Sequence, residues 1–163
     1  YNQFYADGWI KKTEGNVIDK IQIIEYIKYV SSFCEVKVIG FDPYKAVDIT
    51  LDLQSMGYIC GQVRQGARTH DSAIDYWEKE MIDGKIEHDG SPVTVWQVGN
   101  VEIERDSNDN KKMVKVKNKK QKKIDGPISV LNAIVSYLDP ENKEEEAIGM
   151  DEMEQFLKAT GQY

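Results

Sequence analysis

The stretch EVKVIGFDPYKAVDITLDLQSMGYICGQVRQG, residues 35–66, holds two short runs rich in β-branched residues on either side of a helical pattern. The first run ends at Asp42, and the second begins after Gly57. Pro43 suits the first turn of the helix between them, and Gly57 suits its end. A strand, a helix and a second strand joined by short connections predict two parallel neighbours in an α/β sheet.

Further helices are predicted on both sides of this unit. Before it, apolar residues at helical spacing predict a helix over 16–33, with Asp19 as a cap near its start. After it, residues 66–71 are expected to form a polar loop, and residues 72–84 a helix. An apolar pattern after a Gly-Pro pair predicts a last helix over 126–139.

A β-hairpin is predicted over residues 101–117, because alternating apolar residues flank the turn-rich sequence DSNDN. Its second half opens a basic strip, KKMVKVKNKKQKK at 111–123, which holds eight lysines and no acid. The whole chain, in contrast, has a net charge of −7. A basic strip on an acidic body favours attraction of phosphate at one place, and a solvated hairpin is the alternative.

Composition limits the class of protein. The 163 residues suffice for one domain with a real core, and 40% hydrophobic with 30% charged residues is typical of globular chains. No apolar run approaches the roughly 18 residues of a membrane span, so no membrane association is expected. Cys34 and Cys60 are too few and too isolated for a disulfide framework or a zinc site. A reduced, cytoplasmic setting is therefore expected.

Two aspartates stand at strand-to-helix transitions. Asp42 ends a predicted strand, at the edge of an open α/β sheet where ligands bind, and Asp125 follows the lysines directly. Each carboxylate could simply cap the next helix. Together they could instead hold Mg²⁺ or Mn²⁺, hard cations that prefer anionic oxygens and are often completed by substrate phosphate. A pair of ions roughly 4 Å apart can activate a water for phosphodiester cleavage.

Four segments support a more specific interpretation: YNQFYADGWIKKTEGNVID at 1–19, VIGFDPYKA at 38–46, HDGSPVTVWQVGN at 88–100 and KKIDGPISVLNAI at 122–134. In this order they resemble the nuclease domain of the tailed-phage (or prophage) terminase large subunit, over about residues 1–138. The resemblance implies an RNase H-like mixed sheet flanked by helices. It also implies a metal-dependent DNA endonuclease module that cuts concatemeric viral DNA with two divalent ions, Mg²⁺ or Mn²⁺.

By this resemblance, Asp42 is the acid of the second motif and Asp125 the acid of the last, and both are expected to be catalytic metal ligands. His88 and Asn100 match recurrent family positions and are accessory candidates. The family's first catalytic aspartate lies on a strand upstream of the segment that matches Tyr1. The sheet is therefore expected to lack its first strands, and the fragment itself is expected to be weakly active or inactive without that acid.

The resemblance also sets the expected partners. The domain is expected over 1–138, with an acidic C-terminal tail at 139–163, in the cytoplasm of a bacterial host. Double-stranded DNA is the expected substrate, and the full protein would add an ATPase domain, the small terminase subunit and the portal. A non-catalytic DNA-binding or packaging-interaction module, or another RNase H-like nuclease such as a junction resolvase, are the alternatives. The lysines expected to face DNA are Lys115, Lys117, Lys119, Lys120, Lys122 and Lys123.

Overall fold

A computed structural model describes residues 1–13, 15, 19–44, 46–117 and 122–140. No helix in these ranges is long and apolar enough to cross a membrane. Helices and strands alternate irregularly along the described chain. Their bounds are α1 Asn2–Ala6, α2 Lys20–Ser31, β1 Ile39–Phe41, α3 Val47–Ser55, β2 Cys60–Gln62, α4 Ala67–Ile82, α5 Pro92–Val98, β3 Val101–Arg105, β4 Lys111–Lys115 and α6 Asp125–Leu138.

The predicted parallel pair is confirmed. Strands β1 and β2 pair in parallel, with Gly40 opposite Gly61 at the centre of the register. The helix between them, α3, begins at Val47 and not at Pro43 as predicted. The reason is local, because the carboxylate of Asp42 accepts a hydrogen bond from the backbone N–H of Tyr44, which turns the chain before the helix starts.

The predicted hairpin is also confirmed. Strands β3 and β4 pair antiparallel, with Ile103 opposite Met113. Within the described residues this hairpin forms a sheet of its own, so the parallel and antiparallel strands lie in two separate two-stranded sheets. The single mixed sheet expected from the sequence is therefore divided in two in the described part of the chain.

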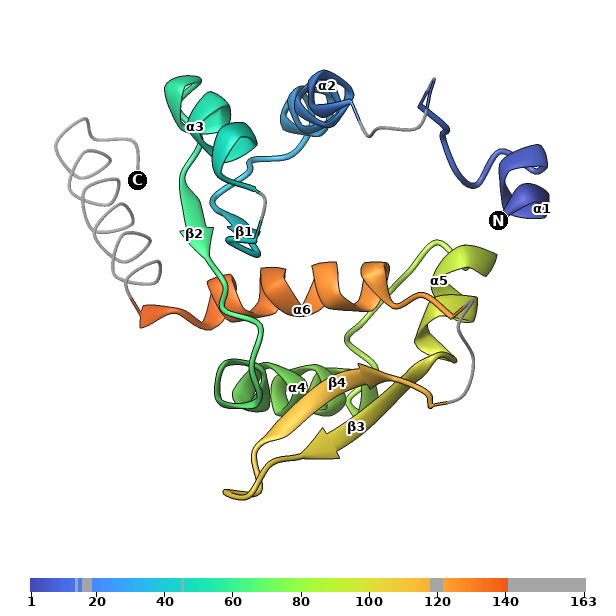
Figure 1. The fold of residues 1–163 in the computed structure, drawn as a ribbon, viewed down its shortest axis with the longest axis vertical. Helices are drawn as coiled ribbons and strands as arrows, with labels where there is room; N and C mark the ends of the chain where they lie inside the picture. The colour runs from blue at the N-terminus through green and yellow to red at the C-terminus, as the bar shows by residue number, and fades with distance from the viewer. Residues whose placement is uncertain (14, 16–18, 45, 118–121, 141–163) are drawn as a thin grey trace, which may run out of the picture.

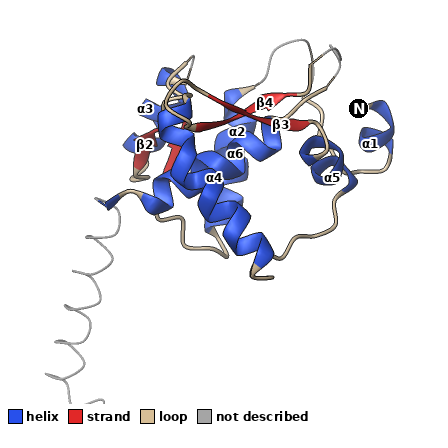
Figure 2. Ribbon diagram, turned by 90° about the horizontal axis from the view of Figure 1, so that it is seen from below, coloured by secondary structure: helices blue, strands red, loops and turns tan. Residues whose placement is uncertain are grey.

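Helix α6 is the central element of the fold (Figure 1). The β1–β2 pair with α2 and α3 lies on one side of it, and α4 with the hairpin lies on the other. Seen from below, α4 crosses α6 directly (Figure 2), and the fully buried core residues Ala73, Ile74 and Leu131 come from these two helices. The core therefore lies on the side of α6 that faces α4, and the other side of α6 supports the parallel strands.

The helix boundaries show which local signals were reliable. Asp19 caps α2 as predicted, since its carboxylate accepts the N–H of Ile21 at 2.9 Å. The predicted loop at 66–71 is wrong, because α4 already begins at Ala67 with Gly66 as its N-cap. His70, within that segment, is buried on the inner face of the helix.

Candidate functional site

Asp42 lies where β1 ends, as predicted. It is half-buried, and its carboxylate bonds to the N–H of Tyr44 at 2.9 Å. The N-cap of α3 is Ala46 and it makes no side-chain cap bond, so Asp42 does not cap that helix. The simple capping interpretation is thus wrong for Asp42, whose carboxylate stabilises only a turn at the end of the strand.

The direction in which β1 leaves the sheet can be read from its neighbour. Gly61 in β2 lies beside Ser136 of α6, whereas Gln65, four residues later, donates a hydrogen bond to Asn132, one turn closer to the start of α6. Because β1 runs parallel to β2, it leaves in the same direction. Asp42 therefore follows β1 on the side of the sheet that faces the beginning of α6.

Asp125 is the first residue of α6, and its side chain is exposed. The N-cap of α6 is Ile124 and not Asp125, and the N-cap residue makes no side-chain cap bond, so the capping interpretation fails here too. The carboxylate still benefits from the helix dipole, because a negative charge in the first turn stabilises a helix by roughly 0.3–1 kcal/mol. Asp125 thus combines a fixed position in the backbone with a solvent-facing carboxylate.

Asp42 follows a strand that packs on α6, and Asp125 opens α6 itself. Gly40 touches α6 at Asn132, seven residues after Asp125, which is about 10 Å along the helix axis. Asp42 follows Gly40 by two residues, or roughly 6–7 Å of extended chain. Both acids therefore stand at ends of elements that pack on α6 or form it, although 83 residues separate them in sequence.

The donor set fits a hard divalent cation in part. Among the described residues, no group of three or more His, Cys, Asp or Glu side chains is placed to hold a metal ion. Asp42 and Asp125 could supply two carboxylates, and Mg²⁺ is usually bound through one or two carboxylates with water and substrate phosphate completing the shell. The chemistry of these two groups matches that mode of binding.

The basic strip at 111–123 is not uniform. Lys115 and Lys123 are exposed and Lys122 is half-buried, whereas the ammonium of Lys117 pairs with Glu104 on β3 at 2.8 Å. Lys119 and Lys120 lie outside the described residues. The predicted DNA-facing set is therefore divided, since a lysine paired with a carboxylate must exchange that partner before it contacts a phosphate.

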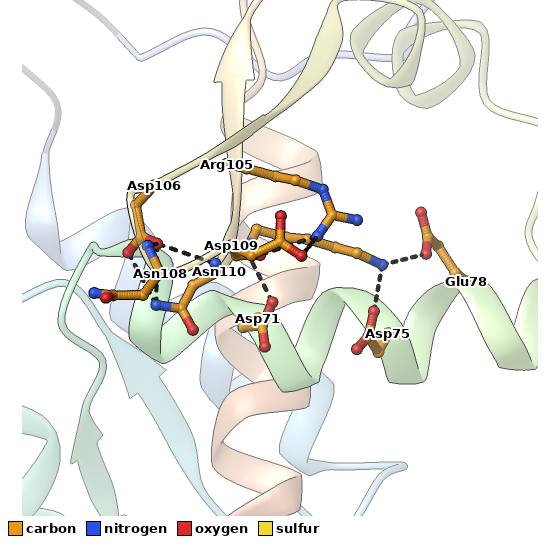
Figure 3. Close-up of polar contacts among 9 residues, drawn as sticks. Asp71, Asp75, Glu78, Arg105, Asp106, Asn108, Asp109 and Asn110 are labelled. Atoms are coloured by element: carbon orange, nitrogen blue, oxygen red, sulfur yellow. Dashed lines mark hydrogen bonds and ion pairs between the residues drawn. The ribbon is translucent and has the colours of Figure 1, made fainter.

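Lys111, at the start of the strip, faces the protein and not solvent. Its ammonium lies between Asp75 and Glu78 of α4, and its backbone N–H donates to Asp71 at 2.8 Å (Figure 3). These hydrogen bonds, first of all the one to Asp75, raise the pKa of Lys111. The lysine anchors the hairpin to α4.

The hairpin turn is stabilised by its own side chains (Figure 3). The Asp106 carboxylate accepts the N–H groups of Asn108 and Asn110, and the Asn110 hydrogen bonds lower its pKa. Arg105 pairs with Asp109, which adopts a positive φ of 66°. This polar cluster therefore defines the tip of the hairpin.

The accessory candidates have structural contacts. His88 lies on an exposed loop, and its Nδ1 accepts the N–H of Gly90 at 3.0 Å. Asn100 is only 3% exposed, and its side-chain amide donates to the backbone carbonyl of Lys123 at 3.1 Å. Asn100 thus holds the residues just before Asp125, a contact that the sequence did not predict.

His70 is a buried histidine outside the candidate site. It is 1% exposed, and neither ring nitrogen has a hydrogen-bond partner among the described residues. Burial lowers the pKa of His70, and the positive charge of Lys112 lowers it further. The neutral imidazole is therefore the form that the fold accepts.

Stability is accordingly expected to depend on pH through His70. The unfolded chain binds a proton there near pH 6.5, before the folded chain does, so the free energy of unfolding should fall as pH decreases below about 6.5. This loss continues until the pH passes the lower pKa of the folded state. Urea unfolding at about pH 7.5 and about pH 5.5 should show a smaller loss in His70→Leu than in the parent. Equal losses would assign the effect to other groups.

Comparison with known proteins places the fold and the family. The family described as terminase large subunit, endonuclease domain, matches residues 1–141. Protein YmfN of Escherichia coli (strain K12) is 27% identical over 135 residues, which are 82% of this chain and 30% of that protein. The crystal structure of the HK97 bacteriophage large terminase matches with a TM-score of 0.70 and 20% identity, over 83% of this chain and 28% of that one.

The structural likeness confirms the predicted RNase H-like α/β fold. The chain spans less than a third of the length of both proteins.

Proposed function

The chain belongs to the terminase large subunit endonuclease domain family, and we propose that it is the metal-dependent DNA endonuclease module of a phage or prophage packaging terminase. One observation carries the proposal beyond family membership. Asp42 leaves β1 toward the beginning of α6, and Asp125 opens α6 with an exposed carboxylate that caps nothing. Two acids in these positions suit a ligand that arrives with the substrate.

In this proposal Asp42 and Asp125 hold a Mg²⁺ or Mn²⁺ ion, with DNA phosphate completing its shell. The bound ion would supply a polarised phosphate and an activated water. The exposed lysines Lys115 and Lys123 would attract the phosphate backbone in a salt-dependent way that is independent of sequence. A second ion is included for the complete domain, because the resemblance to the family implies a further aspartate.

The assignment of the whole protein is part of the same proposal. Residues 1–138 would form the nuclease domain, and 139–163 an acidic tail. In the cytoplasm of a bacterial host, the complete polypeptide would cut concatemeric double-stranded DNA. It would carry an ATPase domain and assemble with the small terminase subunit and the portal. Support for this comes from the family match over residues 1–141.

The test is a calorimetric Mn²⁺ titration of the parent chain and of its Asp42→Asn and Asp125→Asn forms. Each substitution should weaken binding at least about 10-fold, because an amide oxygen replaces an anionic ligand for a hard cation. Asp19→Asn is the matched control, since asparagine caps a helix as well as aspartate does and Asp19 lies at the start of α2. Unchanged binding in both variants would contradict the assignment of these two acids.

A non-catalytic DNA-binding module is the second candidate. The observation that favours it is the absence of a three-ligand group among the described residues, together with the exposed Lys115 and Lys123. In that case the aspartates stabilise only the turn and the helix start. Binding of DNA would then persist when either aspartate is replaced, and there would be no metal-dependent cleavage to lose.

A further inference from the structure

Two buried amide side chains bracket Asp125. The side-chain oxygen of Gln97 accepts the backbone N–H of Gly126, the residue after Asp125. The side-chain nitrogen of Asn100 donates to the carbonyl of Lys123, two residues before Asp125. Gln97 is 7% exposed and Asn100 is 3% exposed. Both lie at or just beyond the end of α5, so one short segment fixes the backbone on both sides of the aspartate.

Gln97 performs the task of a missing cap. The first N–H groups of any helix have no partner within the helix, and α6 has no side-chain cap at its N-cap residue, Ile124. Gln97 supplies an acceptor from a different element. Glycine at 126 leaves room for this approach, because a Cβ there would lie 2.7 Å from the Gln97 side-chain oxygen and would push that oxygen aside.

Asn100 links the same region to the hairpin. Its backbone carbonyl accepts the N–H of Val116, which directly follows β4, while its side chain holds Lys123. Val116 and Lys123 are thus both held by Asn100, which joins the end of the hairpin to the residues just before Asp125.

The side chain of Asp125 lies near this network. The ring of Tyr1 packs edge-on against Trp96, the residue before Gln97. Burial raises the pKa of Tyr1, and the negative charge of Asp125 raises it further. The carboxylate itself remains exposed between its two fixed neighbours. A rigid backbone with a solvent-facing carboxylate is the arrangement that a preorganised ligand requires.

We propose that Gln97 and Asn100 are positioning residues that hold Asp125 in the orientation needed to bind a divalent cation. This inference rests on the proposed function, because it needs Asp125 to be a metal ligand. Residues that orient a ligand from behind typically change metal affinity 10–100-fold when they are replaced. Neither residue touches the ion, so each acts only through the backbone on either side of Asp125.

The test is a Mn²⁺ titration of the parent chain, Gln97→Met, Asp125→Asn and the double variant. Gln97→Met removes the acceptor at nearly constant size and should weaken Mn²⁺ binding about 10-fold. Gln65→Met is the matched control, since Gln65 bonds to α6 at Asn132 and not beside Asp125; it should change affinity less than about 2-fold. The double variant should bind no more weakly than Asp125→Asn alone.

Amide hydrogen exchange at Gly126 reports the same contact without any metal, and should be faster in Gln97→Met than in the parent. If Gln97→Met fails to fold, Gln97→Glu replaces it: a carboxylate retains an acceptor for Gly126, so protection and Mn²⁺ affinity should be kept.

The outcomes separate the two proposals. If the parent binds Mn²⁺ and Gln97→Met binds it equally well, the positioning role is overturned and the proposed function stands. The same conclusion follows if the losses of Mn²⁺ affinity in Gln97→Met and Asp125→Asn add fully in the double variant. Loss of protection or of Mn²⁺ affinity in a folded Gln97→Glu would likewise overturn it. A parent chain that binds no Mn²⁺ would overturn both, because Gln97 would then hold only a helix start.

Discussion

In the complete nuclease domain, Asp125→Asn is expected to lower Mn²⁺-dependent cleavage of linear duplex DNA at least about 100-fold while DNA affinity stays within about 3-fold. Replacing a residue behind a metal ligand already costs up to about 100-fold, so loss of the charged ligand itself should cost at least as much. DNA affinity should persist because it depends on cations such as Lys115 and Lys123. Cleavage and binding of the same labelled duplex measure the two effects.

Stability should not account for that loss. Asp125 makes no side-chain cap bond, so asparagine removes only its interaction with the helix dipole, worth roughly 0.3–1 kcal/mol. The control is Asp19→Asn, which makes the same chemical change at the start of α2 and should leave cleavage unaffected. Cleavage at the parent rate in Asp125→Asn would favour the DNA-binding module. Loss of both cleavage and DNA affinity would show instead that the variant disturbs the basic strip.

Features that depend on neighbouring residues were predicted well from the sequence. The cap at Asp19 needs only a side chain two residues from the N–H that it accepts. The parallel pair β1–β2 follows from two apolar runs joined by a helix, and the hairpin follows from alternation around its polar turn. Each of these sequence patterns spans only one or two elements, so burial and backbone preference favour the same local structure.

Two predicted boundaries are wrong because a second local signal outweighs the first. Pro43 predicts the first turn of a helix, but the carboxylate of Asp42 holds the next residues in a turn. The polar residues before Ser72 predict a loop, although they form the first turn of α4. His70, Ala73, Ile74 and Trp77 follow the spacing of one helix face, so treating the histidine as a buried residue would have extended the helix correctly.

The candidate site was only half accessible to sequence reasoning. Asp42 and Asp125 stand at element ends that the pattern locates, but the contacts around Asp125 join residues 23 and 29 positions apart. Likewise Lys111 belongs by sequence to the basic strip, although carboxylates of α4, more than 30 residues away, surround it. Such contacts depend on how the helices pack against each other, which a local sequence pattern does not predict.

Gly40→Ala is expected to destabilise the fold by about 3 kcal/mol, at the upper end of the range for overpacking. An added Cβ would lie 2.7 Å from the backbone carbonyl oxygen of Asn132, and it would also collide with the Ser136 hydroxyl. A side chain can rotate away, but the Asn132 carbonyl belongs to α6, whose other face contributes Leu131 to the core. Strand β1 would therefore have to move off the helix, and Asp42 would move with it.

Gly61→Ala is the matched control, because its Cβ would meet the nearest atoms at 3.7 and 3.9 Å, which is ordinary contact. It should change stability by less than about 1 kcal/mol, since alanine also restricts the unfolded chain. Urea unfolding measures both variants. Adding Ser136→Ala to Gly40→Ala should restore only part of the loss, because the contact with the Asn132 carbonyl remains. Full recovery in that double variant, or equal stability of the two alanine variants, would show that β1 does not rest on the backbone of α6, and Asp42 would lose the support that directs it toward Asp125.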